Sequence, residues 1–185
     1  MTIEHRVEQL HRRALEALTN ALENIRMGSP AQRKTDEWWT LNIKTALCEL
    51  GQNEALYVSA GSVGPNYVNN KEWLYDVTWA DYGPTGFPDQ QRERRLRNIV
   101  LALESELGNL GDILDDFEKL VQSTAAIRVM AFIKRSDDEF RNRCQLLREV
   151  VDRYENHTRA SYILAGFPES SENDLSIRSF NIEMA

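Results

Sequence analysis

Cysteine and histidine are scarce in this sequence, and their positions exclude several kinds of site. The 185 residues include two cysteines, Cys48 and Cys144, and three histidines. Both cysteines fall in apolar helical patterns and form no CxxC or Cys/His cluster, so neither a disulfide scaffold nor a structural zinc site is indicated. The histidines show no HExxH or similar spacing. Any chemistry is therefore expected to depend on carboxylates.

Long apolar runs and a net positive charge are also missing. No window reaches the ~18 consecutive apolar residues of a membrane span, and the start of the chain, MTIEHRVEQLHRR, lacks the apolar region of a secretory signal, so a cytoplasmic location is expected. The formal net charge of −7 argues against a nonspecific DNA coat, because lysine and arginine make the contacts to phosphate. It is compatible with a nucleic-acid enzyme in which acids gather at a metal site and a basic patch, such as QRERRLR at residues 91–97, persists elsewhere.

The length favours one globular domain with a sizeable core. Residues 2–27 carry one alanine-rich apolar stripe at three- and four-residue steps, which predicts a long helix that ends near Pro30. We expect residues 1–30 to form a helical arm and residues 31–185 to form an α/β domain. The arm could pack on this domain or on a second subunit, in which case it would make a homodimer.

The remaining pattern alternates between helical and extended periods. We expect a helix to begin at Thr35 or Asp36 and end at Gly51, and another to follow Gly111 with Asp112 as its cap. A third helix is expected over residues 137–154. Strands are predicted at 54–60, 72–79, 98–106, 126–133, 161–167 and 175–182. This order predicts a mixed sheet with helices on its faces.

Two glutamates end the most apolar of these strands. Glu104 and Glu106 point to the same face, roughly 7 Å apart at the backbone, because side chains alternate along a strand. Asp76 lies within the preceding strand, so pairing of the two strands would bring three carboxylates together. Like charges about 4 Å apart repel by about 4 kcal/mol at an effective dielectric of 20. A hard divalent ion, Mg²⁺ or Mn²⁺, would remove this repulsion and support phosphodiester hydrolysis. The alternative is a strand end that simply reaches solvent.

The order helix, strand, Asp-bearing strand, Glu-bearing strand, helix, strand over residues 35–133 resembles the core of the PD-(D/E)XK nuclease superfamily. The resemblance implies a restriction-endonuclease-like αβββαβ fold with Asp76 and Glu104 as metal ligands. It also implies a role for Glu49 as the acid of the first helix. Glu106 stands where the family has lysine, so the motif reads E-x-E, a form found in both active and inactive members.

The following helix offers Lys119 as a replacement for the missing lysine. Its spacing from Asp115, four residues earlier, also fits an ordinary surface ion pair. Glu49 lies near the C-terminal end of its helix, where the helix dipole disfavours a negative charge, which hints at a compensating partner.

A long segment joins the two acid-bearing strands and ends in arginines. Arginine forks suit backbone phosphates, so these residues are candidates for nucleic-acid binding beside the metal. A solvated turn of helix is the other interpretation. The candidate phosphate-binding residues are Arg92, Arg94, Arg95 and Arg97.

Taken together, the sequence predicts a Mg²⁺- or Mn²⁺-dependent nuclease. Its partner would be nucleic acid, DNA more than RNA, and no membrane is expected. The competing hypothesis is a catalytically inactive protein of the same fold that acts as an interaction or assembly module.

Overall fold

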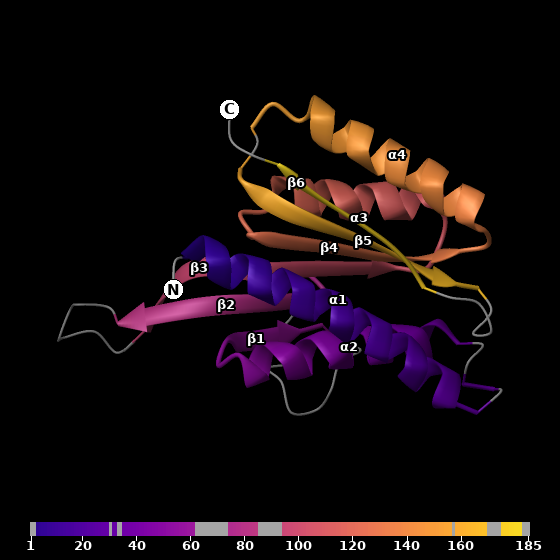
Figure 1. Ribbon diagram of the computed structural model, residues 1–185, viewed down its shortest axis with the longest axis horizontal. Helices are drawn as coiled ribbons and strands as arrows, with labels where there is room; N and C mark the ends of the chain where they lie inside the picture. The colour runs from indigo at the N-terminus through magenta and orange to yellow at the C-terminus, as the bar shows by residue number, and fades with distance from the viewer. Residues whose placement is uncertain are drawn as a thin grey trace.

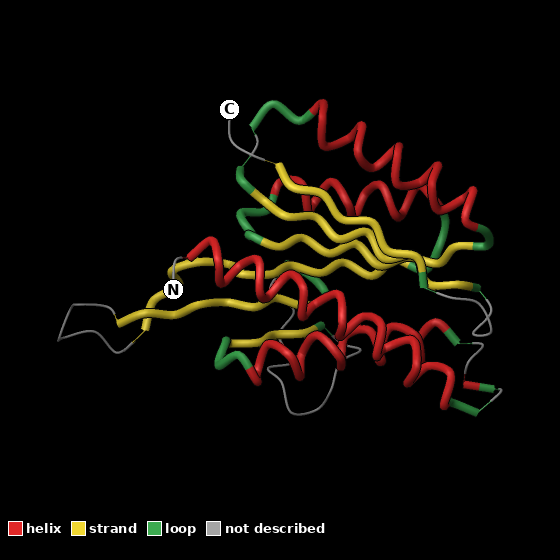
Figure 2. Tube along the Cα trace, in the orientation of Figure 1, coloured by secondary structure: helices red, strands yellow, loops and turns green. Residues whose placement is uncertain are grey.

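The computed structural model describes residues 3–29, 31–32, 35–61, 74–84, 94–156, 158–169 and 175–182. Within these ranges the chain forms four α-helices and one six-stranded sheet (Figures 1 and 2). The elements are α1 Ile3–Met27, α2 Asp36–Asn53, β1 Tyr57–Ala60, β2 Val77–Pro84, β3 Arg94–Glu106, α3 Leu110–Gln122, β4 Ile127–Lys134, α4 Asp137–Arg153, β5 Ala160–Pro168 and β6 Ser176–Ile182.

The strands lie in the sheet in the order in which they occur along the chain, β1 to β6. β1, β2 and β3 pair antiparallel, β3, β4 and β5 pair parallel, and β6 returns antiparallel to β5. The two parallel steps are made through α3 and α4, as parallel connections usually require. The expected mixed sheet with helices on its faces is confirmed.

Helices cover both faces of the sheet, and each face has its own apolar core. α1 and α2 pack on one face, and the β4 side chains that point to this face are Ile127, Val129 and Ala131. α3 and α4 cover the other face, on which Met130 and Phe132 of the same strand lie. The two helix pairs stand on opposite sides of the strands (Figure 1). Central strands are therefore apolar on both faces, which is why they read as continuous hydrophobic runs.

α1 packs on the domain from which it extends. Its stripe, including Ala14, Leu18 and Ile25, is fully buried against the core that α2 and the sheet share. The alanines allow the close approach of α1 and α2 that is visible in Figure 1. A dimer through α1 would therefore have to use the outer face of this helix.

The sequence-based end of α2 at Gly51 is wrong, because the helix continues to Asn53. Gly51 serves a packing contact instead: a β-carbon there would come 2.6 Å from Nε1 of the buried Trp79. The strand expected from residue 54 begins at Tyr57, after Ala55 has taken the left-handed conformation with φ 57° that ends the helix. At the other end, Thr35 caps the helix as expected by accepting from the Trp38 amide.

Two further boundaries differ from the sequence-based ones. Asn109 caps α3 by accepting from the amides of Gly111 and Asp112, so the helix begins before the expected cap, Asp112. β2 runs from Val77 to Pro84, so Asp76, which was expected inside this strand, lies just before it. The strand extends into the expected turn, and residues 72 and 73 lie outside the described ranges.

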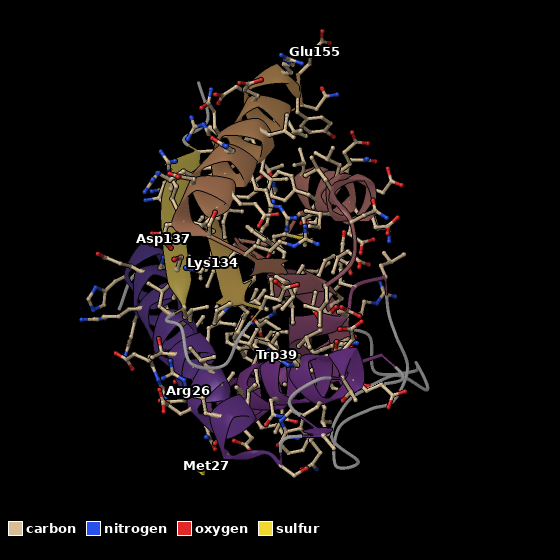
Figure 3. The ribbon with its side chains drawn as sticks, turned by 90° about the vertical axis from the view of Figure 1, so that its right-hand side faces the viewer. Arg26, Met27, Trp39, Lys134, Asp137 and Glu155 are labelled. Carbon is tan, nitrogen blue, oxygen red and sulfur yellow. The ribbon has the colours of Figure 1, made fainter. Side chains whose placement is uncertain are left out.

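The passage from β4 to α4 shows how polar side chains tie the elements together. Lys134 at the end of β4 and Asp137 at the start of α4 lie side by side in Figure 3, with 2.6 Å between Nζ and Oδ1. Ser136 between them caps α4. Among the helices that the structure describes, none combines the length and the apolar character needed to span a bilayer.

Candidate functional site

Asp76 lies immediately before β2, at the edge where this strand meets β3. Its Oδ2 accepts a 2.9 Å hydrogen bond from the backbone amide of Ser105, and its Oδ1 is 2.6 Å from Nζ of Lys44. The carboxylate therefore bridges β3 and α2. Because it bonds to the residue that follows Glu104, Asp76 is held next to the first acid of the E-x-E element.

Lys44 is a member of the site that the sequence interpretation did not include. It comes from the buried side of α2, between Ile43 and Leu47, and only 5% of its side chain is exposed. A lysine on the apolar side of a helix needs a partner, because burial disfavours an unpaired charge. That unusual position was the signal in the sequence, and Asp76 is the partner.

Glu104 is the most deeply buried acid of the site. It projects from β3 onto the face covered by α3, with 5% of the residue exposed, and its Oε1 has no hydrogen-bond partner. The pKa of Glu104 is raised to about 8, chiefly by burial and to a smaller extent by the charges of Asp76 and Asp116. The Lys119 charge and a hydrogen bond from the Asp76 backbone oppose this rise in pKa. At neutral pH the carboxyl group is therefore largely protonated.

Lys119 and Asp116 approach this acid pair from α3. Lys119 Nζ lies 2.5 Å from Oδ1 of Asp116, so the expected pairing with Asp115 is wrong. The hydrogen bond to Asp116 raises the pKa of Lys119, and the charges of Glu104 and Asp76 add to the rise. Lys119 thus belongs electrostatically to the acid site.

Glu106 and Glu49 are less closely tied to this site. Glu106 lies on the same face of β3 as Glu104, but its Oε1 accepts a 2.6 Å hydrogen bond from the Gly108 amide, in the turn that leads into α3. Glu49 is exposed on α2. The charges that shift the pKa of Glu104 come from Asp76, Asp116 and Lys119.

The cysteines are free and buried, as the sequence indicated. The pKa of Cys48 is raised to about 12, chiefly by burial; the charge of Lys44 opposes this rise and that of Glu49 adds to it. Burial likewise raises the pKa of Cys144 to about 11. Neither thiol has the depressed pKa of a nucleophile.

The arginines lie at the opposite end of β3 from the acids. The strand begins at Arg94, and Arg95 and Arg97 are exposed. Arg97 is seven residues from Glu104 along this strand, which corresponds to roughly 23 Å. The expected position of the arginines beside the metal is therefore wrong for Arg95 and Arg97, although their binding to nucleic acid elsewhere stays a prediction. Arg92 lies outside the described residues.

In the part of the chain that the structure describes, no group of three or more histidine, cysteine, aspartate or glutamate residues is arranged to hold a metal ion. The structure brings Asp76 and Glu104 together and adds Lys44, Asp116 and Lys119 around them. Comparisons with protein-family models, curated proteins and solved structures gave no significant match.

Proposed function

We propose that this protein is a metal-dependent nuclease of the restriction-endonuclease-like fold, with its site at Asp76 and Glu104. The observation that carries the proposal is the buried Glu104 Oε1, which lacks a hydrogen-bond partner beside a second carboxylate. Buried polar atoms are nearly always satisfied, and an orphan points to catalysis or to an absent ligand. The order of elements from α2 to β4 also supports the proposed fold.

The residues present fit a hard divalent cation of the magnesium class. Mg²⁺ is usually held by one or two carboxylates and keeps positions for water and phosphate oxygens. Asp76 and Glu104 would supply the two carboxylates, and no third protein acid is required. A bound ion would activate water and neutralise charge on the transferring phosphoryl group.

The surrounding side chains have separate tasks in this proposal. Lys44 and the Ser105 amide fix the Asp76 carboxylate at 2.6 and 2.9 Å, so this ligand is oriented in advance. Lys119, whose side chain is 55% exposed, provides positive charge for the phosphate. Glu104 must lose its proton before it can bind a cation.

The proposal is tested with isosteric variants that keep the fold. Asp76→Asn and Glu104→Gln retain an acceptor oxygen but remove the charge that a cation needs. Wild type incubated with Mg²⁺ or Mn²⁺ should cleave plasmid DNA, linear DNA or RNA, with DNA the better substrate. Each variant should lose cleavage by at least about 100-fold, since it removes a charge that stabilises the transition state. Circular dichroism checks that folding is unchanged.

Glu106→Gln is the matched control, because this acid lies two residues further along the same face and bonds to Gly108. It should reduce cleavage less than Glu104→Gln does. Isothermal titration with Mg²⁺ and Mn²⁺ should show binding to wild type that Glu104→Gln weakens. Wild type that binds neither ion and cuts no substrate would rule the nuclease out.

One observation favours a second candidate, an inactive nuclease-fold module that binds another macromolecule. Lys44 already neutralises Asp76 at 2.6 Å without any metal. In such a protein the pair would be purely structural, and Asp76→Asn would change stability without altering any cleavage. Isothermal titration with Mg²⁺ and Mn²⁺ also separates the two candidates. The inactive module should bind neither ion, so Glu104→Gln would not change its affinity.

A further inference from the structure

The ion pair between Lys119 and Asp116 differs in burial from the Arg141–Asp138 pair of α4, which has the same three-residue spacing. In the surface pair Arg141–Asp138 of α4 the side chains are 66% and 81% exposed. In the α3 pair the lysine is 55% exposed, but Asp116 is only 19% exposed. An exposed pair is worth little, and nothing holds its charged groups in one place. A largely buried acid, by contrast, has one orientation and can fix the ammonium group that it binds.

Helical spacing places this pair on one flank of the buried stripe of α3. Ile113, Phe117 and Leu120 form the buried stripe of the helix. Asp116 and Lys119 are three residues apart on the flank of that stripe, one turn after the other. The charges of both residues shift the pKa of Glu104, and the charge of Asp76 raises the pKa of Lys119. The pair therefore lies against the site and not on the far side of the helix.

We propose that Asp116 is a positioning residue, which holds the Lys119 ammonium group over the Asp76–Glu104 pair where it meets the phosphate of the substrate. This inference rests on the proposed nuclease function. Lysine is a point charge on a flexible four-carbon stem, and it contributes most to catalysis when its position is set before the substrate binds. The 2.5 Å hydrogen bond to Asp116 supplies that restraint.

The α3 helix contains its own control for this inference. Asp115 is the adjacent acid and is exposed. Asp116→Ala and Asp115→Ala therefore remove the same charge from the same helix, but only the first releases Lys119. Asp116→Glu keeps the carboxylate and should restore part of the restraint.

Two readouts follow, of which one does not require activity. Nuclear magnetic relaxation of the Lys119 side chain should show a lower order parameter in Asp116→Ala than in wild type or Asp115→Ala. In steady-state cleavage, Asp116→Ala should lower kcat about 100-fold and change KM little, since displacement of a catalytic group by about 1 Å has effects of this size. Asp115→Ala should leave both constants near those of wild type, and Asp116→Glu should recover part of kcat.

The outcomes separate this inference from the proposed function. If wild type cleaves nothing, the proposed function fails, and the phosphate-binding role of Lys119 fails with it. If wild type cleaves but Asp116→Ala matches Asp115→Ala in kcat, positioning by Asp116 is wrong and the nuclease proposal stands. An unchanged order parameter for Lys119 in Asp116→Ala overturns the inference in the same way.

Discussion

Arg128 and Glu104 are both buried ionisable side chains on the face of the sheet covered by α3 and α4, but their hydrogen bonding is opposite. Arg128 is 1% exposed and donates to the backbone carbonyls of Ala125, Val121 and Ser123 and to the hydroxyls of Tyr162 and Thr158. Glu104 is almost as buried and has one oxygen without any partner.

The two groups are close in the sheet, which makes the contrast informative. Arg128 pairs in register with Ala102, two residues before Glu104, and the charges of both act on Tyr75. The acceptors of the Arg128 guanidinium group are neutral carbonyl and hydroxyl oxygens, and Glu104 is not among them. A buried polar group whose hydrogen bonds are all made is explained by the fold alone, whereas one without a partner requires a further explanation.

The largest effect on stability is expected at Asp76, the acid of the site that does have a charged partner. Asp76→Ala leaves Lys44 buried without a counter-charge, and removal of one member of such a pair typically costs about 3 to 5 kcal/mol. Urea unfolding measures this loss. The double variant Lys44→Met/Asp76→Ala should recover part of it, because both charges are then gone. Additive losses would show that the pair is not coupled.

Arg128→Met is expected to have the next largest effect. The methionine fills much of the space, but several buried acceptors lose their donor, and an unsatisfied buried group costs about 1 to 3 kcal/mol. We expect a net loss of about 2 to 3 kcal/mol of unfolding free energy, with no change in cation affinity. A change in Mg²⁺ binding by this variant would contradict the separation of the two regions.

Glu104→Gln should change how stability depends on pH. The pKa of Glu104 is raised from 4.5 to about 8 in the folded protein, so this state keeps a proton that the unfolded chain has lost. Stability from this group is therefore fully present below about pH 4.5 and is lost as pH rises toward 8. The slope is at most about 1.4 kcal/mol per pH unit. The difference between the unfolding free energies of wild type and Glu104→Gln, measured across this pH range, isolates the contribution of Glu104. Parallel profiles would show that burial does not raise the pKa of Glu104.

Periodicity and turn chemistry were sufficient to predict an α/β protein with a mixed sheet. The apolar runs of β3 to β5 and the stripes of α3 and α4 depend on local residue order, and each predicted element exists. The ends of the helices and strands were harder to predict. In the sequence Gly51 resembles a helix stop, but glycine is needed there because Trp79 packs against it. That contact joins segments far apart in the sequence, so no pattern in the residues around Gly51 indicates it.

The candidate site was predicted only in part, for a similar reason. Asp76 and Glu104 were found because an acid within or directly beside an apolar strand is unusual. Their neighbours depend on long-range geometry: Lys44 meets Asp76 across 32 residues of sequence. The orientation of α3 over β3 likewise decides that Asp116, and not Asp115, faces Glu104. Spacing alone allows both.

Lys119→Met should have the smallest effect on stability and a large one on cleavage. Two lysine–aspartate pairs three residues apart allow a matched test, because their burial is reversed: Lys119 is 55% exposed, whereas Lys134 is 7% exposed and bonds to Asp137 and Ser176. Lys119→Met should cost less than about 1 kcal/mol, because more than half of the lysine side chain is exposed. Lys134→Met should cost more, because it leaves a buried position without its hydrogen bonds.

Cleavage should show the reverse order in the same two variants. Loss of Lys119 removes positive charge from the acid site and should lower kcat by about 100-fold, while loss of Lys134, at the junction of β4 and α4, should leave kcat near wild type. Thermal unfolding and steady-state kinetics on both variants measure the two quantities. If Lys119→Met and Lys134→Met lowered kcat equally, general destabilisation would explain the loss of activity. Lys119 would then have no functional role that Lys134 lacks.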